Sequence, residues 1–239
     1  MAKGGGRSTA KRSPRPPTGR PGRTTINGMN DIAARRFTAI AGIAFSAALI
    51  VEVPLYFVYS DEPPQSNVLT RLLFGILGLG FLLVFVSGLR DLIKRVNPEC
   101  EWVANLLSSA GLAYVVVTLV SSGLEAGAVI ASDKPIDPTI TVTGTYILYG
   151  TIGRMLLAMF LGATAYAIAR TRLLPSWASK GCYVLAGVNL AFVPSLFFGN
   201  EPAHFYAANG WGTTALMGAI LSYWLLAVSI ALLRSARAR

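Results

Sequence analysis

Long apolar runs alternate with short polar connections along most of the chain. Six of these runs are apolar on all faces, whereas a helix of a soluble protein shows an apolar stripe with a period of 3.6 residues. Each run is long enough to cross a bilayer, which takes roughly 20 helical residues. The pattern predicts an all-α fold, a polytopic bundle of six transmembrane helices at about residues 37–59, 68–89, 102–130, 142–169, 181–199 and 211–233.

The N-terminal segment has a different pattern. Its first 28 residues contain no apolar run and are rich in Gly, Pro, Arg and Thr. Such a segment buries too little apolar surface to fold. We therefore predict a disordered basic tail over residues 1–30 and a six-helix transmembrane domain over residues 31–239. Translation from Met29 instead of Met1 is an alternative that would remove this tail.

Composition agrees with a membrane protein and limits what the positive charge means. The 239-residue chain is 53% hydrophobic and 13% charged, whereas soluble domains carry about 25% charged residues. The net charge of +10 invites a nucleic-acid interpretation. The apolar content argues against a soluble basic domain, so we predict the lipid bilayer as the main partner and no nucleic acid.

The basic residues are concentrated on one side of the predicted spans. Of the 21 Lys and Arg residues, 18 fall before the first span, in the 2–3 and 4–5 connections, or at the C-terminus. Because positive loops stay in the cytoplasm, we predict a multi-pass plasma (inner) membrane protein with both termini cytoplasmic. The tail is predicted to contact anionic lipid headgroups; the alternative is that it only sets the topology.

Four charged residues lie within or at the edge of predicted spans: Glu52, Arg71, Glu125 and Arg154. Charges inside a bilayer are costly, so they usually face the bundle interior and find partners. Helical side chains lean toward the N-terminus of their own helix. This lean brings Arg154, Glu52 and Glu125 to a common depth in the outer half of the bilayer. We expect Arg154 to pair with Glu125, Glu52 or both, with Arg71 at the rim.

Two interpretations of this charge cluster stay open. In the first, acids and bases neutralise one another and hold the helices in register, as in a structural or accessory subunit with a protein partner in the membrane. In the second, the cluster is an outward-facing site around Arg154 in a small-molecule transporter or ligand-binding protein. The first is the working hypothesis from the sequence, and a water-accessible cavity reaching Arg154 would favour the second. Three tyrosines at similar depth would line such a site: Tyr56, Tyr146 and Tyr149.

Several other residues carry predictions about helix packing. Pro54 and Pro194 each remove a backbone hydrogen bond and are predicted to bend their helices. The G-x-x-x-G spacing of Gly123 and Gly127 predicts a close-packing surface. Two asparagines are predicted to hydrogen-bond across helices or at an interface: Asn105 and Asn189.

The sequence contains no established catalytic motif. The H-E-x-x-H, G-x-x-x-x-G-K-[ST] and G-x-S-x-G patterns are all missing from it. The single histidine, His204, lies in a predicted loop near Glu201, which is too small a ligand set for a metal site. Cys100 and Cys182 are predicted to be reduced thiols at or near the cytoplasmic face. We therefore predict no enzymatic activity, no metal and no cofactor.

Four stretches carry a resemblance to known proteins: RRFTAIAGIAF and VEVPLYF in the first span, LTRLLFGILGLGF opening the second, and AIARTRLLPSW before the fifth. The chain resembles, over about residues 35–235, a family of six-span bacterial membrane proteins described as a domain of unknown function. The resemblance implies a six-helix bundle in the plasma membrane. It implies no particular activity.

Overall fold

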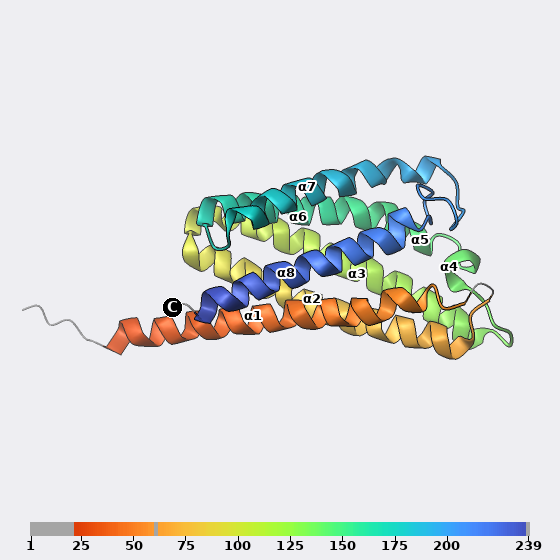
Figure 1. The fold of residues 1–239 in the computed structure, drawn as a ribbon, viewed down its shortest axis with the longest axis horizontal. Helices are drawn as coiled ribbons and strands as arrows, with labels where there is room; N and C mark the ends of the chain where they lie inside the picture. The colour runs from red at the N-terminus through yellow and green to blue at the C-terminus, as the bar shows by residue number, and fades with distance from the viewer. Residues whose placement is uncertain (1–21, 60–61, 238–239) are drawn as a thin grey trace, which may run out of the picture.

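The computed structural model describes residues 22–59 and 62–237 of the chain, so most of the predicted disordered tail lies outside the described residues. Residues 22–30, the described part of that tail, form the start of the first helix instead. Six long helices form an elongated bundle (Figure 1). Within the described ranges the chain forms helices and connections and no strand, which confirms the all-α prediction. The long helices are α1 (Gly22–Leu55), α2 (Gln65–Val96), α3 (Glu101–Ala131), α6 (Gly153–Thr171), α7 (Ser176–Phe192) and α8 (Met217–Arg237).

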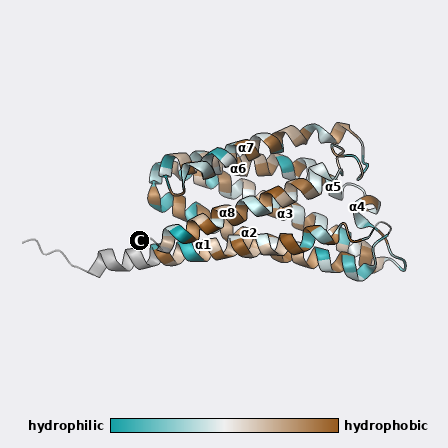
Figure 2. Cartoon of the chain, viewed as in Figure 1, coloured by the Kyte–Doolittle hydropathy of each residue, from teal (hydrophilic) through white to brown (hydrophobic). Residues whose placement is uncertain are grey.

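Six helical segments are long and apolar enough to span a membrane, as the sequence predicts. Apolar residues run along the helices on the outside of the bundle as well as the inside (Figure 2). Large side chains such as Phe37, Trp102 and Val184 are more than 60% exposed, which suits contact with lipid. The spans are Asp31–Leu55, Gln65–Val96, Pro98–Ala131, Thr145–Thr171, Ser176–Phe197 and Gly212–Ala236.

Irregular helical segments gather at one end of the bundle, where residues 132–144 and 198–211 connect the helices (Figure 1). We call this the loop end. The other short element, η1 (Pro98–Cys100), joins α2 to α3 at the opposite end. The elements at the loop end are α4 (Pro138–Thr141), α5 (Thr145–Ile147), the π-helical turns η2 (Leu148–Ile152) and η4 (Gly212–Leu216), and the 3₁₀ turn η3 (Val193–Phe197).

The helices pack in the order α8, α1, α2, α3, α6 and α7, so the last helix lies against the first. A tryptophan links the two ends of this row. The indole Nε1 of Trp224 on α8 donates to Sγ of Cys182 on α7 at 3.4 Å. The Trp224 ring also meets Trp177 edge-on, with 5.4 Å between ring centroids. Cys182 and Cys100 are buried free thiols.

Only some of the glycines and prolines have the packing or bending role that the sequence predicts for them. A Cβ on Gly42 of α1 would collide with Oγ of Ser229 on α8 and would lie 2.7 Å from Cδ2 of Phe85 on α2, so this glycine lets α1 approach both helices closely. Gly123 and Gly127 have nothing within 4 Å of an added Cβ, and the predicted close packing at this pair is wrong. Helix α1 ends at Leu55, directly after Pro54, rather than bending there. Pro194 does interrupt span five, where α7 gives way to η3.

Candidate functional site

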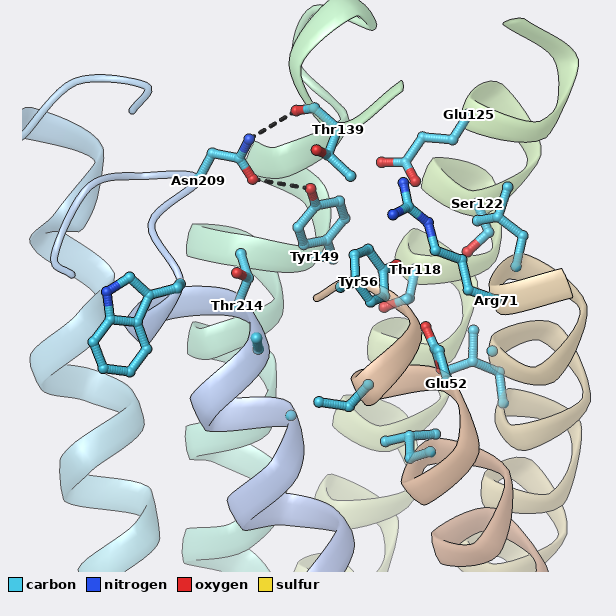
Figure 3. A pocket seen from close by; sticks show the side chains of 18 of the residues that line it. Glu52, Tyr56, Arg71, Thr118, Ser122, Glu125, Thr139, Tyr149, Asn209 and Thr214 are labelled. Atoms are coloured by element: carbon cyan, nitrogen blue, oxygen red, sulfur yellow. Dashed lines mark hydrogen bonds between the residues drawn. The ribbon is translucent and has the colours of Figure 1, made fainter. Parts of the chain in front are cut away.

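A cavity of about 250 Å³ lies at the loop end of the bundle, between side chains of α1, α2, α3, α6 and α8. All four charged residues of the predicted cluster line it: Glu52, Arg71, Glu125 and Arg154. Figure 3 shows the Glu52, Arg71 and Glu125 side chains turned toward the same space from three helices. The four charged residues that the sequence places in one cluster thus lie around one cavity. Tyr56 and Tyr149 also line the cavity, whereas Tyr146 is not among the lining residues.

Glu52 and Glu125 form the acidic part of the wall. The Glu52 carboxylate lies over Gly75 of α2, where an added Cβ would come within 3.0–3.1 Å of the carboxyl atoms. Gly75 therefore provides the room that this carboxylate occupies. Glu125 on α3 is only 3% exposed, and its Oε1 has no hydrogen-bond partner among the described residues. A buried carboxylate oxygen without a donor carries a desolvation cost that a bound group can relieve.

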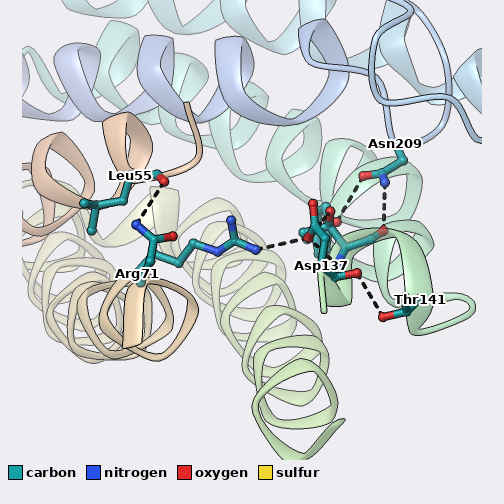
Figure 4. A network of polar contacts seen from close by, with 8 residues as sticks. Leu55, Arg71, Asp137, Thr141 and Asn209 are labelled. Carbon is teal, nitrogen blue, oxygen red and sulfur yellow. Dashed lines mark hydrogen bonds and ion pairs between the residues drawn. The ribbon is translucent and has the colours of Figure 1, made fainter. Parts of the chain in front are cut away.

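Arg71 is paired, but with a residue outside the predicted cluster. Its Nη2 lies 3.2 Å from Oδ1 of Asp137, and its guanidinium carbon lies 4.1 Å from the centroid of the Tyr56 ring. Asp137 Oδ1 also accepts hydrogen bonds from the backbone N–H and the hydroxyl of Thr139, at 3.1 and 2.8 Å. Figure 4 shows Asp137 at the end of the extended Arg71 side chain. This carboxylate therefore caps α4 and holds Arg71 at the same time.

Arg154 corrects the pairing that the sequence predicts. Its guanidinium is buried, and it donates from Nη1 to Oδ1 of Asn189 and from Nη2 to the backbone carbonyl of Tyr149, both at 3.4 Å. In the part of the chain that the structure describes, no Asp or Glu oxygen lies within 4.0 Å of it. Its Nε has no partner there either. The Arg154 side chain therefore faces α7, not the carboxylates of α1 and α3.

The π-helical turn before α6 explains this orientation. The sequence predicts one continuous helix through the fourth span, but Gly150 in η2 has non-helical dihedrals of φ −76° and ψ −107°. The break turns the Tyr149 carbonyl toward Arg154 one helical turn later. Backbone without regular helical bonds is tolerated at membrane depth where it lines a cavity. Gly150 is also close to the connection above it, because an added Cβ would lie 3.0 Å from the Ala208 carbonyl oxygen.

The Asn209 side chain holds the connection 198–211 over the cavity by two hydrogen bonds. Its amide Nδ2 donates to the Thr139 carbonyl at 2.8 Å, and its Oδ1 accepts from the Tyr149 hydroxyl at 3.2 Å (Figure 3). Asn209 is 5% exposed, so both bonds are shielded from water. This one side chain ties the connection to α4 and to η2.

The chain matches no protein-family model, no curated protein and no solved structure. The family resemblance seen in the sequence therefore stays a prediction.

Several polar residues of the cavity escaped the sequence analysis. On α3, Tyr114, Thr118 and Ser122 line it together with the predicted Glu125, at spacings of four, four and three residues. That spacing places polar groups on a single face of an otherwise apolar helix. These lining residues could therefore have been predicted from the sequence. The residues contributed by the short elements and connections of the loop end gave no such signal: Asp137, Thr139, Asn209 and Thr214.

The other polar predictions lie away from the cavity or at its edge. Asn105 accepts two hydrogen bonds from the Arg90 guanidinium, at 3.0 and 2.9 Å, which joins α3 to α2. Asn189 joins α7 to α6 through Arg154. Both asparagines thus hydrogen-bond across helices as predicted. Among the described residues, no group of three or more His, Cys, Asp or Glu side chains is placed to hold a metal ion.

Proposed function

We propose that the chain is a multi-pass plasma-membrane protein that binds a small solute carrying an anionic group, with Arg154 as the partner of that group. The observation that carries the proposal is a buried, permanently charged guanidinium that lines a cavity and has no carboxylate oxygen within 4.0 Å among the described residues. This is the second of the two interpretations left open by the sequence. The first interpretation requires every charge of the cluster to be paired within the protein. Arg154 does not meet this requirement among the described residues.

The unused hydrogen-bond donors of the Arg154 guanidinium support an anionic ligand. A guanidinium has five N–H donors in a planar fork that matches a carboxylate or phosphate. Arg154 uses two of them, in long hydrogen bonds to neutral oxygens, and its buried Nε is one of those left over. A charge within a membrane span is expensive without a partner. A bound anion would supply both the missing charge and the missing acceptors.

The size of the cavity limits the ligand. Pockets for drug-sized molecules measure roughly 300–1,000 Å³, and this one measures about 250 Å³. The lining is mixed: apolar side chains such as Phe45, Leu49 and Leu79 accompany the charged and hydroxyl groups. These features suit a small metabolite with a short apolar part better than a lipid or a peptide.

The positive-inside distribution supports an outward-facing cavity. The basic residues within 90–95, at the end of α2, and within 170–180, around the connection of α6 to α7, lie at the end opposite the loop end. If that end is cytoplasmic, the loop end and its cavity face outside. Single cysteines replacing Arg95 and Lys134 test this in intact cells, on a background in which Cys100 and Cys182 are serine. We expect a membrane-impermeant maleimide to label the cysteine at 134 and not the one at 95; the reverse pattern would invert the topology.

Thermal unfolding of the purified chain in detergent tests the binding proposal. The probes are sodium acetate, butyrate and phosphate, each compared with sodium chloride at equal ionic strength. A ligand at a hundred times its Kd stabilises by about 2.7 kcal/mol. For a chain of this size that corresponds to a rise in Tm of roughly 5–11 °C. We expect at least one of the three probes to give a rise in this range.

Variants of two arginines in the same helix identify the binding group. We expect Arg154→Met to abolish the anion-dependent rise and Arg154→Lys to keep part of it, because lysine retains the charge without the planar fork. Arg170→Met is the matched control, because Arg170 lies in the last turn of α6, is exposed and is not among the cavity residues. An equal rise in the parent and in Arg154→Met would place the anion elsewhere. No rise with any probe in the parent would overturn the proposal.

A further inference from the structure

We infer that the ligand is amphoteric, with a cationic group that binds at Glu125 and Glu52 while its anionic group binds at Arg154. The inference rests on the proposed function and names the chemistry of the other end of the solute. It is carried by an observation separate from Arg154, namely a buried carboxylate oxygen in the same cavity, Oε1 of Glu125, that has no hydrogen-bond partner among the described residues.

Glu125 carries that oxygen. Its side chain lines the cavity, is 3% exposed, and leaves Oε1 without a hydrogen-bond donor among the described residues. Figure 3 shows the carboxylate pointing into the space between the helices. A carboxylate in such a site accepts hydrogen bonds from a charged donor more strongly than from a neutral one. An ammonium group is therefore the chemistry that the free oxygen suits.

Arg71 does not satisfy this need. It faces Glu52 and Glu125 in the cavity (Figure 3), but the ion pair within 4.0 Å that it forms among the described residues is with Asp137. Its guanidinium is also stacked on the Tyr56 ring. Arg71 and Asp137 thus balance each other, and the cavity retains two carboxylates on one side and one guanidinium on the other.

The wall between the two poles is formed by α3. Tyr114 lies next to the start of α6, because a Cβ added at Gly153 would be 3.3 Å from its ring, and Arg154 is the next residue of that helix. From Tyr114 to Glu125 the helix rises roughly 16 Å, at 1.5 Å per residue. Thr118 and Ser122 lie between them on the same face. Side chains reaching in from both ends shorten this distance, so a solute with a few methylene groups between its charges fits better than one without.

A series of amino acids of increasing length measures both the charge and the spacing. The probes are glycine, γ-aminobutyrate and ε-aminocaproate, each compared with the carboxylate of equal length that lacks the amino group: acetate, butyrate and caproate. Binding is measured on the full chain in detergent by Tm shift and by isothermal titration. In the parent we expect the amino group to strengthen binding roughly tenfold or more for the longer pairs, as a charge-assisted hydrogen bond to a buried group does, and to add least for glycine.

Substitution of the carboxylates separates the two poles. We expect Glu125→Gln to remove the gain from the amino group while leaving the binding of the plain carboxylates, and Glu52→Gln to reduce the same gain. Arg154→Met should abolish both kinds of binding. Glu101→Gln is the matched control, because Glu101 lies on the same helix α3 but at the opposite end, paired with Lys94. Glu52→Gln also serves as the second variant if Glu125→Gln does not fold.

The outcomes distinguish this inference from the proposed function. If butyrate or caproate binds through Arg154 and the amino group adds nothing, the inference is wrong and the proposed function stands. If the gain persists in both Glu125→Gln and Glu52→Gln, the cationic group binds elsewhere and the inference is also wrong. If neither the amino acids nor the carboxylates bind the parent, both fail together.

Discussion

Removing the charge of Asp137 is a direct test of how the loop end is held together. Asp137 Oδ1 lies 3.2 Å from Arg71 and also accepts two hydrogen bonds from Thr139. An asparagine at 137 keeps an oxygen for Thr139 but removes the negative charge. An alanine removes both functions. The pair of substitutions therefore separates the ion pair from the cap of α4.

The expected magnitude follows from the burial of the two partners. Removing one member of a buried ion pair typically costs about 3–5 kcal/mol. The Arg71 side chain is 3% exposed but that of Asp137 is 30% exposed, and Arg71 retains its contact with the Tyr56 ring. We therefore expect Asp137→Asn to cost about 2 kcal/mol, below the lower end of that range, and Asp137→Ala about 1 kcal/mol more for the lost cap.

Thermal unfolding in detergent measures this series. A loss of about 2 kcal/mol lowers Tm by roughly 4–8 °C in a protein of this size. The matched control is Asp133→Asn, which removes the same charge from an exposed residue of the same connection and should change stability by no more than about 0.5 kcal/mol. The reasoning is refuted if Asp137→Asn and Asp133→Asn lower Tm equally, or if Asp137→Ala is as stable as the parent.

Three further predictions concern packing around and below the cavity. Gly42→Leu should lower Tm by several degrees, because overpacking a tight helix contact costs about 1–3 kcal/mol; parent-like stability would mean that α1 can move away from its neighbours freely. Trp224→Ala should expose Cys182 to a small maleimide in the folded chain, whereas the parent thiol should react only on unfolding, as followed by mass spectrometry. Gly75→Val should weaken the binding of γ-aminobutyrate more than that of butyrate, because the added side chain displaces the Glu52 carboxylate; equal weakening in titrations would show that the valine only fills the cavity.

The extent of the spans could be predicted from the sequence because the signal is local. Each stretch of about 20 apolar residues reports its own environment, independent of how the helices pack. The depths of Glu52, Glu125 and Arg154 were predicted from equally local information, because the rise per residue and the lean of helical side chains depend only on the helix itself. All three residues line the same cavity.

Rotation about the helix axis could not be predicted in the same way. Whether Arg154 faces α3 or α7 depends on which helices pack side by side and on the π-helical turn at η2. Neither follows from apolar content, since the helix is apolar on all faces. Asp137 and Asn209 were equally out of reach, because their roles come from connections that fold over the cavity and meet residues more than 60 positions away in the chain.

The packing of α8 against α1 has a consequence for how the protein is made. Membrane proteins are synthesised from the N-terminus, so α1 enters the bilayer long before its neighbour α8 exists. Until then the α1 surface that carries Arg35 has no Ser235 to contact, and the cavity has no wall at Thr214 and Gly218. Before α8 is made, the chain therefore exposes the polar surface of α1 and the open side of the cavity to lipid or to the insertion machinery. A ribosome that stops before residue 212 leaves a protein with both acidic and basic poles in place and no enclosed site between them.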